Sequence, residues 1–341
     1  MLIITTAISG SGRKDYLKKF EEYARAHNKK VKLYSVGEML FEQAEKIGVN
    51  ISAENILNTN PAVISSLRSA VFENVKGTLP EALKQNDVVI INLHAFFFWK
   101  KVFARAFDRF YLREFKPDLF ISFIDNSKNI QKKLSARKQW HDEDMSQEEV
   151  LYWQNIECEV TADWAELYEK QFYSIAVQQP AATLYKLLFH PEMEPIYVSM
   201  PMTHLNEPAD KAKVDRFVEK LDQYFTVFDP RTVEIDTPTR MGEDDKAVYY
   251  HTVNRDLYWL IKQSKKVIAF YPKNVSSPGV INELREAYET NKDVWLVVPT
   301  KDHRSPFLVC FCNKVFESEH EFFEFLDTEG YKKLSDKKSH E

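Results

Sequence analysis

The chain begins with Met1-Leu-Ile-Ile-Thr-Thr-Ala-Ile-Ser-Gly10-Ser-Gly12-Arg13-Lys14-Asp15, and this stretch indicates the fold of its first half. The apolar residues at its start are typical of a short buried β-strand, which we expect at Leu2–Thr6. A turn at Ser9–Gly12 follows, and helical sequence runs from Lys14 to about His27. Strands that alternate with helix-length segments predict a parallel sheet with crossover helices.

The alternation continues along the rest of the chain. Further strands are expected at Lys30–Val36, Asp87–Leu93, Asp118–Ile124 and Phe172–Val177. Two prolines in His190–Pro195 then mark a linker. After the linker, strands are expected at Ile196–Met200, Thr226–Asp229, Lys266–Tyr271 and Asp293–Val298. We therefore predict two doubly wound parallel-sheet α/β domains, at residues 1–189 and 190–331, and a polar tail at residues 332–341.

The composition excludes several classes of protein. The chain has 46 Lys and Arg residues and 51 Asp and Glu residues. Proteins that bind nucleic acids normally have an excess of basic residues, so we expect no nucleic-acid partner. No run approaches the roughly 20 apolar residues of a membrane helix, so no membrane partner is expected either. The 3 cysteines are an odd, sparse set that fits a reducing compartment, which predicts a cytoplasmic protein. With 8 glycines in 341 residues, each is expected where the backbone needs it.

The first glycines lie in a loop between a strand and a helix, where backbone N–H groups can surround a phosphate. Measured against the consensus G-x-x-x-x-G-K-[ST], Gly12 matches the second glycine, but Ala7 replaces the first, Arg13 the lysine and Lys14 the hydroxyl residue. The hydroxyl that would hold Mg²⁺ is therefore absent, and no metal site is predicted. We expect a nucleotide phosphate, if any ligand, at Gly10, Ser11, Gly12, Arg13 and Lys14. The alternative is a tight turn that binds nothing.

Three further segments of the first half carry a resemblance. They are Asp87-Val-Val-Ile-Ile-Asn-Leu-His94, Pro117-Asp-Leu-Phe-Ile-Ser-Phe-Ile-Asp125 and Gln154-Asn155. Together with the loop, they resemble the archaeal-type adenylate kinases and their relatives over residues 1–180. Where that family carries an Asp, this chain has Asn92. The resemblance implies a P-loop kinase-like domain with a degenerate phosphate loop, retained for nucleotide binding or regulation. Arg137 and Lys138 are lid cations by the same resemblance, or else a solvated helix end.

The second half carries three segments in a fixed order. They are Ile196-Tyr197-Val-Ser-Met-Pro-Met-Thr203, Asn254-Arg255-Asp256-Leu-Tyr-Trp-Leu260 and Ser276-Ser-Pro-Gly279-Val-Ile-Asn-Glu283. Together they resemble the nucleoside 2-deoxyribosyltransferase superfamily over about residues 195–300. Within it, the branch that hydrolyses the N-glycosidic bond of deoxynucleoside 5′-monophosphates is most similar. The resemblance implies a flavodoxin- or Rossmann-type fold and a homo-oligomer.

The best catalytic candidate is Glu283, about one turn into a helix that begins at Pro278-Gly279. Since glycosidic cleavage passes through an oxocarbenium-like state, a carboxylate here can attack C1′ of the sugar. The alternative is a first-turn Glu that offsets the helix dipole. The resemblance implies that Asp256 orients the nucleophile or protonates the departing base, with Tyr197 beside them. The alternatives are a surface helix carboxylate at Asp256, paired with Arg255 or Lys262, and a buried core residue at Tyr197. The substrate-binding residues it implies are Ser277, Gly279, Asn282, Met200 and Lys273.

We therefore expect an enzyme that cleaves the base–sugar bond of a nucleotide or nucleoside, by hydrolysis or by transfer. This cleavage needs no cofactor, and the N-terminal domain is expected to bind a nucleotide or to regulate. Two alternatives stay open. One is a nucleotide or nucleoside kinase that uses the N-terminal loop, and the other is a non-enzymatic nucleotide sensor.

Overall fold

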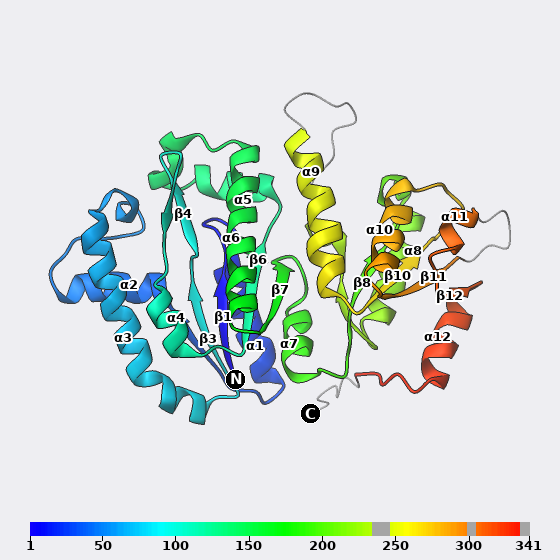
Figure 1. The fold of residues 1–341 in the computed structure, drawn as a ribbon, viewed down its shortest axis with the longest axis horizontal. Coiled ribbons are helices and arrows are strands. Elements are labelled where there is room, and N and C mark those ends of the chain that lie inside the picture. Colours follow the sequence, from blue (N-terminus) through cyan, green and yellow to red (C-terminus); the bar gives the residue numbers. More distant parts are fainter. Residues whose placement is uncertain (234–245, 299–304, 335–341) are drawn as a thin grey trace. The chain divides into compact units, whose positions relative to one another are not determined.

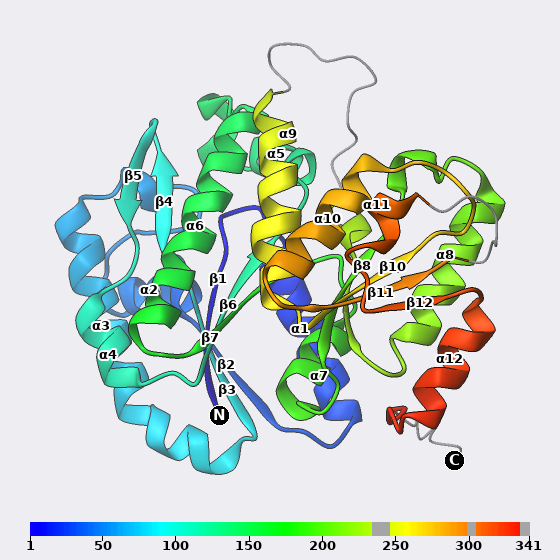
Figure 2. The ribbon, with the colours of Figure 1, turned by 45° about the vertical axis from the view of Figure 1, so that its right-hand side comes forward.

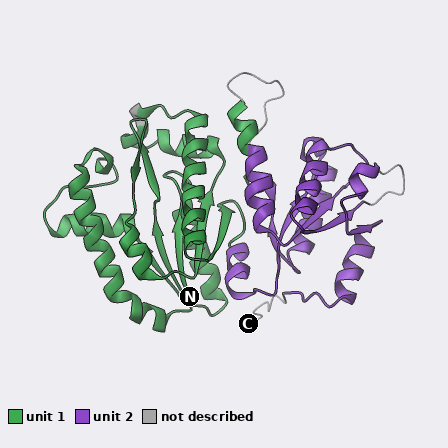
Figure 3. Cartoon of the chain, viewed as in Figure 1, with its two compact units in different colours: residues 1–181, 233–251 green, residues 182–232, 252–341 purple. Residues whose placement is uncertain are grey.

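The protein is described by a computed structural model, which covers residues 1–233, 246–298 and 305–334. The chain forms two compact units (Figure 3). One unit comprises residues 1–181 and 233–251, and the other comprises residues 182–232 and 252–341. Each is built on its own five-stranded parallel sheet flanked by helices (Figure 1), as the alternation of strands and helices predicts. Most of the predicted polar tail, from residue 335 on, lies outside the described residues.

The sheet of the first unit has the strand order β2-β3-β1-β6-β7, and all its strands are parallel. The strands span Val31–Ser35 (β2), Val88–Leu93 (β3), Leu2–Thr6 (β1), Leu119–Ile124 (β6) and Gln171–Ala176 (β7). β1 is fully buried between β3 and β6. The loop that follows β1 therefore emerges from the middle of the carboxyl edge, where ligands bind in open parallel sheets.

Helices and one hairpin complete this unit. α6 (Gln147–Leu167) packs against β1, β6 and β7 and passes across one face of the sheet (Figure 2). The antiparallel hairpin of β4 (Phe96–Trp99) and β5 (Val102–Arg105) stands outside the main sheet and was not predicted. The helices are α1 (Arg13–Ala26), α2 (Val36–Lys46), α3 (Pro61–Gln85), α4 (Arg109–Phe115), α5 (Ser127–Ser135) and α6 (Gln147–Leu167), with short 3₁₀ turns at Ile56–Asn58 and Lys138–Glu143.

The sheet of the second unit has the order β12-β11-β10-β8-β9. Its strands span Lys314–Phe316 (β12), Asp293–Val297 (β11), Lys266–Phe270 (β10), Pro195–Ser199 (β8) and Thr226–Phe228 (β9). Counted from β8 as the first strand, this is the flavodoxin-like order 2-1-3-4-5. The connections leave in opposite directions on either side of β8 and β10, so the ligand crevice is expected beyond the carboxyl ends of these two strands.

The helices of the second unit are α7 (Ala181–Phe189), α8 (Pro208–Leu221), α10 (Pro278–Glu289), α11 (Pro306–Val309) and α12 (Glu319–Thr328). A further helix, α9 (Lys246–Asn254), begins in the first unit and continues as a π-helix at Arg255–Ile261 in the second. π-helical turns are rare and frequently occur at functional sites. Within the described residues, no helix is long and apolar enough to cross a membrane.

Candidate active site and phosphate loop

Strand β8 presents two hydroxyl side chains to the same side of its sheet. Tyr197 and Ser199 are two residues apart, and alternate residues of a strand share a face. Both side chains have no solvent exposure. The intervening Val198 packs in a different core cluster from Tyr197, as the alternation requires. The two hydroxyl groups therefore lie next to each other on one face of the sheet, near the carboxyl end of β8.

Helix α10 brings a carboxylate onto these hydroxyls. It begins at Pro278 after the N-cap residue Ser277, whose hydroxyl accepts a hydrogen bond from the backbone N–H of Val280 at 3.4 Å. One turn further, Tyr197 Oη donates to Glu283 Oε1 at 2.9 Å, and Ser199 Oγ donates to Glu283 Oε2. Each carboxylate oxygen of Glu283 is thus held by a hydroxyl from one rigid strand.

A second carboxylate comes from the π-helix. Asp256 is 6% exposed, and its Oδ1 accepts a hydrogen bond from Nε of Arg255 at 2.8 Å. Burial raises the pKa of Glu283 to about 8, and the negative charge of Asp256 adds to the rise, while Ser199 and Tyr197 oppose it. Burial also raises the pKa of Asp256, against the attraction of Arg255. Both carboxyls therefore favour their protonated forms more than a solvent-exposed carboxyl does.

The structure therefore brings together three of the predicted residues, Glu283, Asp256 and Tyr197. These residues are far apart in the sequence, and they come together because β8, the π-helix and α10 all contact one another. Ser199 belongs to the same group and was not predicted. The available signal was its place two residues after Tyr197 on the same strand, but a serine inside a strand usually reports nothing about function.

The predicted substrate-binding residues are more dispersed. Ser277 and Gly279 lie at the start of α10, Asn282 is exposed on that helix, and Met200 is buried directly after β8. Lys273, in the segment after β10, places its Nζ 2.6 Å from Oδ2 of Asp210 on α8. The ammonium of Lys273 is thus neutralised by a carboxylate of its own unit.

The glycine-rich loop of the first unit needs its glycines. Gly10 and Gly12 have φ values of +82° and +85°, in the left-handed region that other residues rarely adopt. A Cβ on Gly10 would also lie 3.1 Å from Cγ of Leu134. α1 begins at Arg13 directly after Gly12, so the first turn of the helix continues the loop.

The two cations predicted in this loop are bound to other groups. Arg13 donates from Nη1 to the backbone carbonyls of Ala7 (3.2 Å) and Leu93, and its Nη2 lies 3.4 Å from Nε2 of His94. Burial lowers the pKa of Arg13 to about 10, and the carboxylate of Glu157 opposes this. Lys14 forms an exposed ion pair with Glu38 of α2. Arg13 therefore fastens β1 to β3 through their carbonyls.

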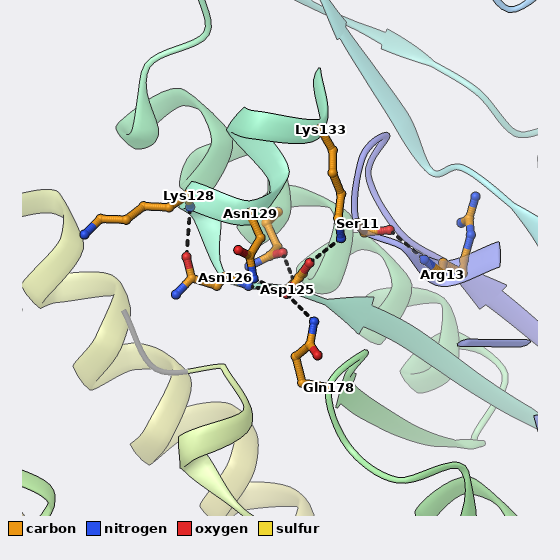
Figure 4. A network of polar contacts seen from close by, with 9 residues as sticks. Ser11, Arg13, Asp125, Asn126, Lys128, Asn129, Lys133 and Gln178 are labelled. Carbon is orange, nitrogen blue, oxygen red and sulfur yellow. Dashed lines mark hydrogen bonds and ion pairs between the residues drawn. The ribbon is translucent and has the colours of Figure 1, made fainter. Parts of the chain in front are cut away.

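A different cation reaches the loop from α5. Figure 4 shows the side chain of Lys133 extended toward Asp125, while the side chain of Arg13 points away. Lys133 Nζ lies 2.8 Å from Oδ2 of the fully buried Asp125, and 3.0 Å from the point where a Cβ on Gly12 would stand. Oδ1 of Asp125 accepts the backbone N–H of Asn126 at 2.8 Å and also faces the amides of Asn129 and Gln178. This network fixes the ammonium at the loop.

The loop borders a cavity of about 380 Å³, within the range of small-molecule sites. Two arginines, Arg68 and Arg137, and three aromatic side chains, Phe41, Phe97 and Trp140, are among the residues that line it. Burial lowers the pKa of Arg68, and Asp108 opposes this. A cavity with guanidinium groups and aromatic walls has the chemistry to hold an anionic ligand with a flat ring.

The first unit is therefore a parallel α/β unit that presents a glycine-rich loop at the carboxyl end of its central strand. Residues 6–151 of the chain match the family model of an AAA domain. This match supports the P-loop, kinase-like resemblance of the N-terminal half. It also supports the kinase alternative, because it covers the N-terminal loop that this alternative uses, and it gives no support to glycosidic cleavage by the C-terminal half.

No curated protein matches the chain in sequence. Among solved structures, the "Crystal structure of conserved protein from Enterococcus faecalis V583" is similar, with 15% sequence identity and a TM-score of 0.29. The match covers 40% of this chain and 99% of that one. At this TM-score the likeness decides nothing about fold or function. The resemblance of the C-terminal half to the deoxyribosyltransferases therefore stays a proposal.

Proposed function

We propose that the second unit breaks the N-glycosidic bond of a nucleotide or nucleoside, with Glu283 as the nucleophile. The observation that supports this most directly is the pair of hydroxyl donors, Tyr197 and Ser199, on the two oxygens of Glu283. Such a clamp holds a carboxylate in one orientation, and orientation is a large part of the advantage of a nucleophile in a site. The carboxyl ends of β8 and β10 are also where this sheet order places a ligand.

The chemistry needs one ionised and one protonated carboxyl. In the first step, an oxygen of Glu283 forms a bond to C1′ while the bond from C1′ to the base nitrogen breaks, and its electron pair leaves with the base. Asp256 gives its proton to that nitrogen. Water or a second base then attacks C1′, releases Glu283 and returns a proton to Asp256. Burial raises the pKa of both carboxyls and favours the protonated form of Asp256, whereas the hydrogen bonds from Ser199 and Tyr197 favour the ionised form of Glu283.

Mass spectrometry of a mixed panel of nucleosides and nucleotides tests this proposal. We expect release of free base by the wild-type chain and at least a thousandfold slower release by Glu283→Gln, because a carboxamide cannot act as the nucleophile. Glu286→Gln, on the same helix, is the matched control and should keep the wild-type rate. Equal rates for wild type and Glu283→Gln would remove Glu283 from the reaction.

A second candidate function belongs to the first unit and is favoured by the AAA-domain match. We propose that its loop binds the phosphates of a nucleotide, with Lys133 in place of the consensus lysine, because the ammonium of Lys133 and not the guanidinium of Arg13 lies at Gly12. Bound in this way, a nucleotide would serve as the phosphate donor of a nucleotide or nucleoside kinase.

Incubation with ATP labelled in its γ-phosphate separates the outcomes. Label transfer to a nucleoside or nucleoside monophosphate that is lost in Lys133→Ala supports the kinase. Binding of ATP without transfer or base release would instead support a nucleotide sensor. If ATP does not bind at millimolar concentration, this second candidate fails.

A further inference from the structure

We infer that Ser199 positions the nucleophile: its hydroxyl holds Oε2 of Glu283, so that the carboxylate plane is set by two donors of β8 and not by Tyr197 alone. The inference names a residue for the glycosidic cleavage proposed above and rests on that function.

Hydrogen bonds at both oxygens fix the orientation of the Glu283 carboxyl group. A carboxyl group held at one oxygen can still turn about the bond that carries it, whereas donors at both oxygens leave it one orientation. Tyr197 and Ser199 occupy a strand that is paired on both sides, with Tyr197 opposite Val267 of β10 and Phe228 of β9. Ser199 lies opposite Ala269 of β10. The backbone that carries the two donors is therefore held in the sheet, on both sides at Tyr197 and on the β10 side at Ser199.

The hydroxyl of Ser199 also acts on the charge of Glu283. Glu283 faces Tyr197 and Ser199 from β8, Asp256 and Arg255 from the π-helix, and Tyr271 from the end of β10. Asp256 disfavours the ionised form of Glu283, and the groups bonded to its oxygens are neutral hydroxyls. Donation from Ser199 therefore stabilises the ionised form that attacks the sugar. The hydrogen bond from Ser199 occupies one lone pair of Oε2 of Glu283 and leaves the other lone pair of that oxygen unoccupied.

A second buried serine distinguishes a positioning hydroxyl from one that only forms a structural hydrogen bond. Ser264 offers the comparison, because it is also buried in the second unit and donates to the backbone carbonyl of Leu260 at 2.7 Å. Ser199→Ala and Ser264→Ala each remove one buried hydroxyl. A structural role predicts similar consequences for both substitutions, whereas a positioning role predicts an effect on Glu283 for Ser199 only.

The first measurement needs no substrate. A ¹³C NMR titration of protein labelled at the glutamate side-chain carboxyl carbon reports the ionisation of Glu283, whose signal is identified by its loss in Glu283→Gln. We expect Ser199→Ala to move the titration of this signal to higher pH by about one unit, because the ionised form loses a donor. Ser199→Thr should restore it, and Ser264→Ala should leave it in place. An unchanged titration in Ser199→Ala overturns the inference.

The second measurement follows base release. Ser199→Ala should lower kcat by about tenfold or more with less than a twofold change in KM, and shift the rising limb of the pH profile upward. Loss of kcat equal to that of Ser264→Ala would count against the inference. If wild type releases no base from any substrate, the proposed function fails, and the titration still decides whether Ser199 controls Glu283.

Discussion

The ammonium of Lys133 lies 3.0 Å from the position that a Cβ on Gly12 would occupy. A cation from α5 therefore stands beside Gly12, the residue that matches the second glycine of the consensus. The carboxylate of Asp125, fully buried at the end of β6, holds it there. The phosphate loop thus keeps a cation although its own Arg13 is bound to backbone carbonyls.

The first prediction concerns this cation. Lys133→Ala should weaken the binding of ATP by at least tenfold, because an ammonium fixed beside backbone N–H groups stabilises phosphate oxygens. Isothermal titration calorimetry measures the affinity. Lys132→Ala, an exposed neighbour on α5, should bind ATP as wild type does. Equal loss in both variants would mean that general charge, and not the position of Lys133, attracts the nucleotide.

The second prediction concerns the loop backbone. Gly12→Ala should lower the free energy of unfolding of the first unit by about 1–2 kcal/mol, because alanine is strained at a φ of +85°. Gly77→Ala is the matched control, since nothing lies within 4 Å of its added Cβ. It sits inside α3 and should stabilise by about 0.5–1 kcal/mol. Denaturant unfolding measures both, and a stabilised Gly12→Ala would contradict the strain.

The third prediction follows from the pKa of Glu283, which burial raises from 4.5 to about 8 in the folded chain. The folded state therefore holds a proton that the unfolded state has lost between these two pH values. The contribution of Glu283 to the free energy of unfolding is therefore fully present below pH 4.5 and is lost as the pH rises to about 8. Since Glu283→Gln does not titrate, its stability relative to wild type should be greater at pH 8 than at pH 5, as measured by urea unfolding. A difference that is independent of pH would show that the pKa is not raised.

The fourth prediction concerns Glu157, a buried carboxylate of α6. It accepts the backbone N–H groups of Ala95 and Phe96, both at 2.8 Å, and burial raises its pKa to about 7. Glu157→Ala should destabilise the first unit by about 3 kcal/mol or more, because two buried donors lose their acceptor. Thermal and denaturant unfolding check this. Glu166→Ala, exposed on the same helix, should change the stability by less than about 0.5 kcal/mol.

Much of the fold could be predicted because its central strands are continuous apolar runs. β3 and β6 are buried along their whole length, and such strands belong to parallel sheets with helices on both faces. The hairpin of β4 and β5 was missed for a physical reason. Its turn is made by Lys100 and Lys101 at φ values of +50° and +62°, where the usual signal is Asn-Gly or Asp-Gly. β12, with three residues, is too short for a periodic pattern.

The residues of the candidate sites could be predicted where they lie in local sequence patterns. Gly10, Gly12 and Glu283 follow local patterns, a strand-to-helix turn and a helix start, that sequence displays. The direction of Arg13 depends on a carbonyl of β3 that is 80 residues away. The hydroxyl of Ser199 gains its partner only when α10 packs on β8. Contacts of this kind are set by tertiary structure and leave no mark in the local sequence.

The course of the chain through α9 limits how the protein can be dissected. Residues 246–251 belong to the first unit, where Val248 packs with Leu151 and the ring of His251 lies 5.6 Å from that of Tyr152, yet they are continuous with the π-helix that carries Asp256. A fragment that starts near residue 182 would therefore keep Asp256 but lose the packing partners of the helix that leads to it. A piece of the chain that preserves the described contacts of α9 and of the π-helix must therefore contain residues of both units.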